Sequence, residues 1–220
     1  MDILGFAARF MHFYIPFLFA LCFHEYAHGF VAKLCGDNTA KMMGRLTMNP
    51  LAHIDPIGTF LLPVISTLFQ IPLFFGWAKP VPVNSRNFKH PKNDMFWVAL
   101  AGPASNILLA FVGWLGLIAT GIFFFHTAYF QTMISLLAMF IQINLFLAFF
   151  NLIPVNPLDG GKILARFLPA SVNYKLEQNQ QMISLILMAL FIFGPLRQVL
   201  SLPVEWTYEM MVHAAERLMS

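Results

Sequence analysis

Two histidines and a glutamate in the first part of the chain have the residue types and the spacing of a metal site. His24 and His28 are four residues apart, so on a helix both imidazole rings lie on one face and can reach one metal ion. Glu25 projects from the adjoining face, where a carboxylate can act as a base on water at the metal without binding the metal itself. The H-E-x-x-H pattern therefore predicts a hydrolytic zinc site.

The surroundings of this pattern are unusual for a soluble hydrolase. Residues 10–23, which lead into it, contain no Asp, Glu, Lys or Arg. An ionisable residue at membrane depth is costly and by default marks a functional site. The alternative is that both histidines are interfacial helix residues without a metal, and the pattern alone leaves that alternative open.

Composition places the chain in a membrane. Only 10% of its 220 residues are charged and 59% are hydrophobic, whereas soluble proteins carry about 25% charged residues. The net charge is +3, and no run of Lys and Arg with interleaved aromatic residues suggests a nucleic-acid partner. Cys22 and Cys35 are the two cysteines and lack a Cys-rich zinc spacing. A thiol ligand from Cys22 is a weaker hypothesis than a small buried apolar residue.

Stretches without charged side chains predict where the chain crosses the membrane. Residues 95–158 contain no Asp, Glu, Lys or Arg, and at about 1.5 Å per residue they suffice for two helices. Residues 3–34 and 182–202 predict one span each, followed by an amphipathic tail. Residues 56–78 are also free of charge but contain Pro63 and Pro72, which break a helix.

The expected fold is an all-α polytopic membrane protein with about four to six transmembrane helices. Between the first span and the helix that contains Ala101, Gly102 and Pro103, we expect a Pro-rich re-entrant or β-like segment. Residues 1–220 are expected to form a single domain, with a catalytic core over about residues 3–168. The span at 182–202 and the tail add to that core.

Basic residues predict the orientation. Three groups of Lys and Arg, at residues 33–45, 79–92 and 162–175, belong on the cytoplasmic side by the positive-inside rule, and the turn near His126 has none. An even number of crossings must then separate residues 45 and 79, which favours the re-entrant interpretation. The His24–His28 end of the first span and the end of the span at 128–152 therefore meet at the cytoplasmic face.

A third ligand is needed because two histidines leave a catalytic zinc ion one protein ligand short. Asp159 is the only acidic residue between Asp94 and Glu177, and it directly follows an apolar span. Its alternative role is the N-cap of the next helix. Only the ligand role completes the metal site.

Six segments follow one another in this order: His24–His28, Gly44–Pro50, His53–Pro56, Gly76–Pro82, Ala101–Asn106 and Leu158–Gly160. Together they resemble the site-2 protease family of intramembrane zinc metalloproteases. Asn156 departs from the pattern, since the family often has proline there. The resemblance implies one Zn²⁺ ion held by His24, His28 and Asp159, with Glu25 as the general base. It also implies transmembrane protein substrates within the lipid bilayer, a compact member without a PDZ or CBS domain, and a prokaryotic inner membrane.

Two further residues are candidates for binding substrate. Asn106 is an amide inside a charge-free helix and could donate to the substrate backbone or the oxyanion, an interhelical hydrogen bond being the alternative. If residues 79–83 form a strand, Pro80 and Pro82 remove the donors from one edge. The other edge, with Val81, would then pair with an unwound substrate segment.

A transporter of metal ions or protons is the rival function, because intramembrane His, Glu and Asp residues also mark ion pathways. It predicts ion flux across a bilayer and no peptide hydrolysis. The absence of an inverted repeat counts against it. The sequence leaves open which protein is cut, whether a prior cut is needed, and whether the chain forms a homo-oligomer.

Overall fold

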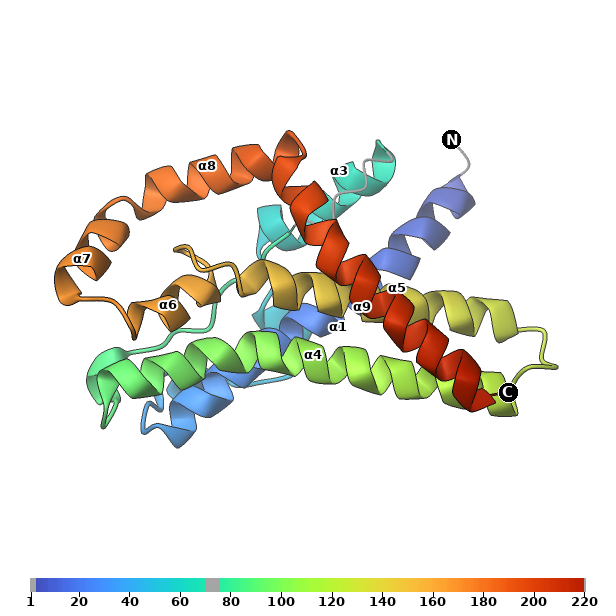
Figure 1. Ribbon diagram of the computed structural model, residues 1–220, viewed down its shortest axis with the longest axis horizontal. Helices are drawn as coiled ribbons and strands as arrows, with labels where there is room; N and C mark the ends of the chain where they lie inside the picture. Colours follow the sequence, from blue (N-terminus) through green and yellow to red (C-terminus); the bar gives the residue numbers. More distant parts are fainter. Residues whose placement is uncertain (1–2, 70–75, 220) are drawn as a thin grey trace.

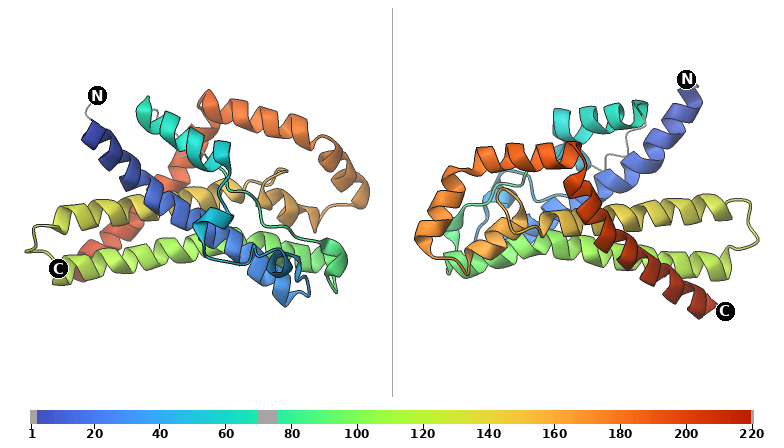
Figure 2. Two further views of the ribbon diagram at one scale, coloured as in Figure 1. Left: turned by 180° about the vertical axis from the view of Figure 1, so that it is seen from behind. Right: turned by 45° about the horizontal axis from the view of Figure 1, so that its top comes forward.

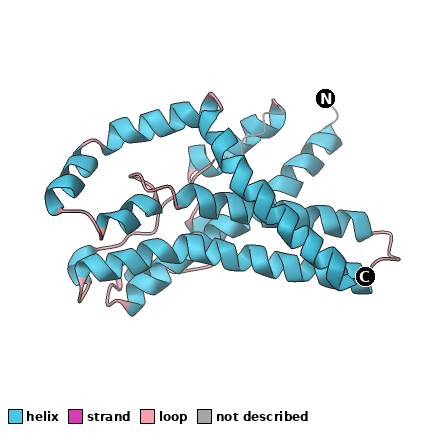
Figure 3. Cartoon of the chain, in the orientation of Figure 1, coloured by secondary structure: helices cyan, strands magenta, loops and turns pink. Residues whose placement is uncertain are grey.

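The structure, a computed structural model, describes residues 3–69 and 76–219, and these fold into helices joined by turns and one extended segment (Figure 1). No strand occurs in these two ranges (Figure 3). The elements are α1 (Ile3–Leu34), α2 (Thr39–Met42), η1 (Pro50–Ala52), η2 (Pro56–Leu61), α3 (Leu62–Leu68), η3 (Ser85–Asn87), α4 (Pro91–Phe123), α5 (Phe130–Asn151), α6 (Asp159–Ala165), α7 (Ala170–Gln178), α8 (Gln180–Ile192) and α9 (Pro195–Met219).

Three helices in the described ranges are long and apolar enough to cross a membrane, namely α1, α4 and α5. The pair α8 and α9 also passes this test but is bent by 71° at Gly194, so it counts as a broken span or a re-entrant loop. The all-helical membrane fold predicted from the sequence is confirmed. The described residues contain three such spans, or four with the bent pair, and only the count of four falls within the predicted range of four to six.

Within its described residues, the Pro-rich segment between α1 and α4 contains no helix long enough to cross a membrane. Residues 56–68 form a continuous apolar helical stretch of η2 and α3, shorter than the roughly 20 residues that a crossing needs. The hydroxyl of Thr59 donates to the carbonyl oxygen of Trp77 at 2.7 Å, so the two ends of the segment meet. This contact supports the re-entrant alternative. Pro72, which the sequence offered as a breaker, lies outside the described residues.

The long helices pack closely against one another, with a glycine at one close contact. Helices α4 and α5 lie side by side along the long axis of the molecule, and α1 crosses them (Figures 1 and 2). A Cβ atom on Gly113 of α4 would lie 2.9 Å from the side chains of Phe140 and Ile141 of α5, so glycine permits this close approach. One cluster of buried side chains joins α1 to α5, and a second joins α4 and α5 to α8 and α9.

Candidate metal centre

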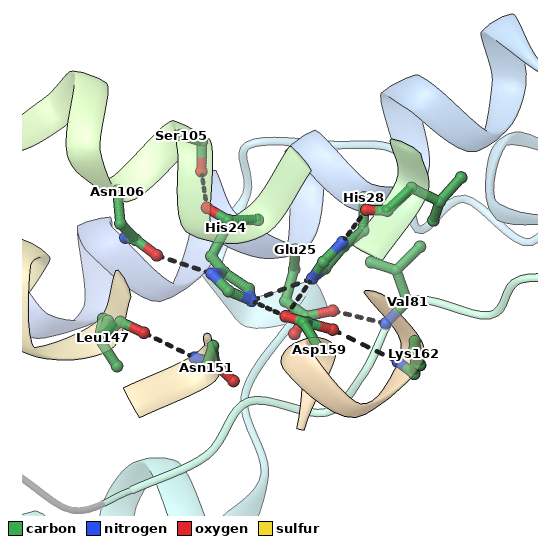
Figure 4. A network of polar contacts seen from close by, with 12 residues as sticks. His24, Glu25, His28, Val81, Ser105, Asn106, Leu147, Asn151, Asp159 and Lys162 are labelled. Atoms are coloured by element: carbon green, nitrogen blue, oxygen red, sulfur yellow. Dashed lines mark hydrogen bonds and ion pairs between the residues drawn. The ribbon is translucent and has the colours of Figure 1, made fainter. Parts of the chain in front are cut away.

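Three ligand atoms from two distant parts of the sequence, His24 and His28 of α1 and Asp159 of α6, converge at one point beside α4 (Figure 4). Nε2 of His24 and Nε2 of His28 are 3.0 Å apart, and each lies 3.1 Å from Oδ2 of Asp159. All three side chains are buried. Within residues 3–69 and 76–219 this is the one group of three or more His, Cys, Asp or Glu residues that could hold a metal ion.

The hydrogen bonds on the far side of each imidazole leave the Nε2 atoms free to bind a metal. Nδ1 of His28 lies 2.6 Å from the carbonyl oxygen of Val98, and a carbonyl oxygen only accepts, so Nδ1 carries the proton. Nδ1 of His24 lies 2.6 Å from Oδ1 of Asn106. With both protons on Nδ1, two nitrogen lone pairs face a carboxylate oxygen at contact distance, an arrangement that a cation stabilises.

The space beside these three atoms exists because the neighbouring helix has no side chain there. A Cβ atom on Gly102 of α4 would collide with Nε2 of His28 and lie 2.6 Å from Nε2 of His24. Ligand atoms about 2.1 Å from a tetrahedral zinc ion are about 3.4 Å from one another. The observed separations of 3.0–3.1 Å are close to that value. The donor set and the spacing both fit zinc.

Asp159 reaches this point from the first residue of α6. The residue before it, Leu158, is the N-cap, and the carboxylate makes no capping hydrogen bond, so the alternative role that the sequence suggested is not seen. Gly160 and Gly161 let the turn at 152–156 pack against α6, because a Cβ atom on either would collide with that turn's backbone.

Comparison with known proteins shows which family the chain belongs to. The model of peptidase family M50 matches residues 118–195. "Putative zinc metalloprotease YwhC" of Bacillus subtilis is 38% identical over 180 residues, which are 81% of this chain and 78% of that protein. The chain belongs to peptidase family M50. Rip2 of Mycolicibacterium smegmatis, with a name of the same form, is 31% identical over 87% of this chain and 71% of that protein.

A third relative is stage IV sporulation protein FB of Bacillus subtilis, 29% identical over 64% of this chain and 46% of that protein. No solved structure matches the chain. Family membership confirms the resemblance to site-2 proteases and makes the protein an integral-membrane, intramembrane metalloprotease. The names of the relatives imply zinc. The transporter alternative finds no support.

In this M50 protease, Glu25 faces a cavity of about 340 Å³ that also contains the three candidate ligands. Oε2 of Glu25 accepts a hydrogen bond of 2.7 Å from the backbone N–H of Val81 (Figure 4). Val81 belongs to the extended segment that forms one wall of the cavity. The carboxylate is therefore held in place beside the candidate metal position.

The extended segment at 79–83 is not the strand with a free edge that the sequence suggested. The N–H of Lys79 donates to the carbonyl oxygen of His53 at 2.9 Å, and the N–H of Val81 donates to Glu25. Of the three predicted edge donors, only the N–H of Val83 has no partner among the described residues. The amide of Val81 is thus already used by Glu25, and the proposed pairing of substrate at Val81 is wrong in that respect.

Asn106 also lies elsewhere than the substrate hypothesis required. Its side chain is fully buried and does not line the cavity. Its Oδ1 faces His24, and its Nδ2 donates to Oδ1 of Asn144 at 2.9 Å. Since both ends of the amide are occupied within the helix bundle, the structure supports the alternative, an interhelical hydrogen bond.

Two cavity residues were not singled out as binding groups from the sequence. Asn151 ends α5, and its Nδ2 donates to the carbonyl oxygen of Leu147 at 3.0 Å. Its Oδ1 has no hydrogen-bond partner in the part of the chain that the structure describes. Lys162, half exposed, places Nζ 3.4 Å from Oδ1 of Asp159. The position of Asn151 eight residues before Asp159 was the available signal, but it predicts a helix cap equally well.

Asp37 fixes the far end of the extended segment. Its buried carboxylate accepts hydrogen bonds from the N–H of Asn84 and from Nδ2 of Asn87, both at 2.7 Å, and from Thr39. Burial alone would raise the pKa of Asp37, but these hydrogen bonds lower it below its ordinary value of 3.8. Asp37 thus connects the end of α1 to the segment that carries Val81.

We expect Asp37→Asn to loosen this segment. The amide nitrogen of the new side chain would face at least one of the present donors, and a hydrogen bond to a charged group contributes about 1.5–3 kcal/mol. Hydrogen exchange at the Asn84 amide should therefore become about ten- to a hundredfold faster. Asp94→Asn is the matched control, because Asp94 accepts from the N–H of His90 outside the segment. Unchanged exchange at Asn84 in Asp37→Asn would contradict the connection.

The same contact predicts a pH dependence in the wild type. Because the folded-state pKa of Asp37 lies below 3.8, the stabilisation is complete above that value and is lost as the pH falls through the lower, folded-state pKa. Protection of the Asn84 amide should fall only in that acid range.

Proposed function

We propose that this M50 protease is a zinc-dependent endopeptidase with one Zn²⁺ ion held by Nε2 of His24, Nε2 of His28 and Oδ2 of Asp159. The observation that carries the proposal is the convergence of these three acceptor atoms, within 3.1 Å of one another, in a cavity that contains Glu25. Catalytic zinc sites with three protein ligands keep a fourth position for water or substrate.

Zinc in this position would acidify a water molecule and polarise the scissile carbonyl. Glu25 takes the proton from the attacking water and passes it to the leaving amine, as a general base and then a general acid. The N–H of Val81 keeps the carboxylate of Glu25 in one orientation through both transfers. Gly102 keeps the space beside the histidines open.

The cavity has groups that can hold a peptide backbone. Oδ1 of Asn151 and the N–H of Val83 are a free acceptor and a free donor at its wall, within the described residues. A peptide can use both only if its own backbone groups are free, so the substrate helix must unwind locally. We therefore propose membrane-spanning helices as substrates, cut where they unwind.

The proposal also covers the extent of the catalytic core and the orientation of the active site in the membrane. Every candidate ligand and its hydrogen-bond partners lie between residues 20 and 162, inside the predicted core of about 3–168. We propose a single catalytic domain with the active site toward the cytoplasmic side of a prokaryotic inner membrane. The support is the positive-inside rule applied to the basic loops around residues 33–45, 79–92 and 162–175.

The deciding experiment measures zinc content and cleavage together. Purified protein should contain about one zinc ion per chain, and in liposomes it should cut some members of a panel of single-pass membrane helices. Removal of the zinc by a chelator should stop cleavage, and added zinc should restore it. Zinc-dependent ion flux without cleavage of any helix would overturn the proposal in favour of a transporter.

A further inference from the structure

A chain of buried amides runs from α5 through α4 to the candidate ligand His24. Asn106 and Asn144 are both fully buried. Oδ1 of Asn106 lies 2.6 Å from Nδ1 of His24, and Nδ2 of Asn106 donates to Oδ1 of Asn144 at 2.9 Å. Nδ2 of Asn144 donates to the carbonyl oxygen of Phe140 at 2.8 Å. Figure 4 shows the His24 end of this chain.

Two backbone carbonyls fix the direction of donation along the chain. A carbonyl oxygen only accepts, so Phe140 requires the NH₂ group of Asn144 to face it, and the oxygen of Asn144 must face Asn106. The NH₂ group of Asn106 then points to that oxygen and to the carbonyl oxygen of Ala20, 3.3 Å away. The oxygen of Asn106 is left facing His24, where it can only accept.

The direction decides which nitrogen of His24 carries the proton. An acceptor at Nδ1 requires the neutral ring to hold its proton there, and the lone pair is then on Nε2, the atom that faces His28 and Asp159. If the amide of Asn106 were reversed, its NH₂ group would face Nδ1. His24 would then carry its proton on Nε2 and could not bind a metal through that atom.

Asn144 is the stronger of the two constraints on the Asn106 amide. The oxygen and nitrogen of an amide are nearly the same size, so packing does not distinguish the two orientations. The contact with Ala20, at 3.3 Å, is longer than the usual range of about 2.7–3.2 Å. The contact with Asn144 is 2.9 Å, and reversal would bring two oxygens together at that distance in a buried site.

We propose that Asn144 is a positioning residue which, by orienting the amide of Asn106, keeps the Nε2 lone pair of His24 directed at the metal. This inference rests on the proposed zinc site. It assigns a role to a residue of α5 that does not line the cavity and whose hydrogen bonds go to Asn106 and to Phe140, not to a candidate ligand. The two residues act together: Asn106 contacts His24, and Asn144 fixes which way the Asn106 amide faces.

The first test removes the acceptor on α5. Asn144→Leu and the smaller Asn144→Ala should both lower the affinity for zinc about tenfold, the lower end of the range for partners beyond the ligands. Affinity is measured by chelator competition on the purified protein. Nitrogen-15 NMR of histidine-labelled, metal-free protein should show that His24 no longer holds its proton only on Nδ1. Gln142→Leu is the matched control, a polar residue of the same helix that faces α9.

The second test separates orientation from packing. A carboxylate has an acceptor on both sides, so Asn106→Asp offers an oxygen to His24 however it is turned. Added to Asn144→Leu, it should return the zinc affinity to within about threefold of wild type. Thermal unfolding of each metal-free variant checks that the compared proteins are folded.

Three outcomes would overturn the inference. They are wild-type zinc affinity in Asn144→Leu and Asn144→Ala, an unchanged His24 tautomer in both, and no recovery when Asn106→Asp is added. If the wild type itself binds no zinc, the proposed function fails and the inference fails with it, which is a different result from wild-type binding that Asn144→Leu does not alter.

Discussion

We expect Glu25→Gln to keep its zinc and to lose about 10²- to 10⁴-fold in the rate of cleavage, the contribution typical of a positioned general base. The amide of glutamine has nearly the shape of the carboxylate, and its oxygen can still accept the hydrogen bond from the N–H of Val81. The three candidate ligands are untouched. An amide, however, cannot take a proton from water at neutral pH. The measurement pairs zinc content with cleavage of the best helix of the panel.

The control for this variant is Glu205→Gln, the same substitution on α9, where Glu205 lines a separate cavity between α5 and α9. It should leave both zinc content and cleavage unchanged. If Glu25→Gln cleaves within about tenfold of wild type, Glu25 is not the general base. If instead it loses its zinc, Glu25 contributes to binding the metal, and the division of roles between Glu25 and Asp159 is wrong.

The candidate ligands could be predicted from the sequence because each follows from a local rule. The four-residue spacing of His24 and His28 needs only a helix, and the structure provides one in α1. Asp159 is identified by elimination, since residues 95–158 offer no other charge. What joins them is the positive-inside rule, which places both ends at one membrane face. The structure brings the three atoms within 3.1 Å of one another.

The partners of these residues could not be predicted, because they depend on which way a side chain faces in the packed bundle. An amide in a charge-free helix, such as Asn106, can face a cavity or another helix, and helical periodicity does not distinguish the two. The sequence does not show that the N–H of Val81 donates to Glu25, so from the sequence alone this N–H is expected to be free to bind a substrate. The prolines at 80 and 82 suggested a strand edge, but an extended segment needs a partner strand to become one.

Asp159→Asn should abolish the metal site without unfolding the protein. The variant loses the anionic ligand, so zinc affinity should fall by more than about a hundredfold, beyond the range for residues that act through a ligand. Cleavage should be lost with it. In the metal-free state, however, the new NH₂ group can donate to Nε2 of His24 or of His28, which lie 3.1 Å from the present Oδ2. The metal-free variant should therefore unfold at a temperature at least as high as the metal-free wild type.

Lys162→Met separates this effect from the loss of an ion pair. Nζ of Lys162 is 3.4 Å from Oδ1 of Asp159, but the lysine side chain is 49% exposed, and such exposed pairs contribute about 0–1 kcal/mol. The zinc affinity of Lys162→Met should consequently change by less than about fivefold. If Asp159→Asn and Lys162→Met weaken zinc binding equally, the loss comes from breaking the ion pair between the two residues, and Asp159 is not a ligand. If Asp159→Asn binds zinc like the wild type, Asp159 is not the third ligand. The convergence of the three atoms then needs an explanation other than zinc binding.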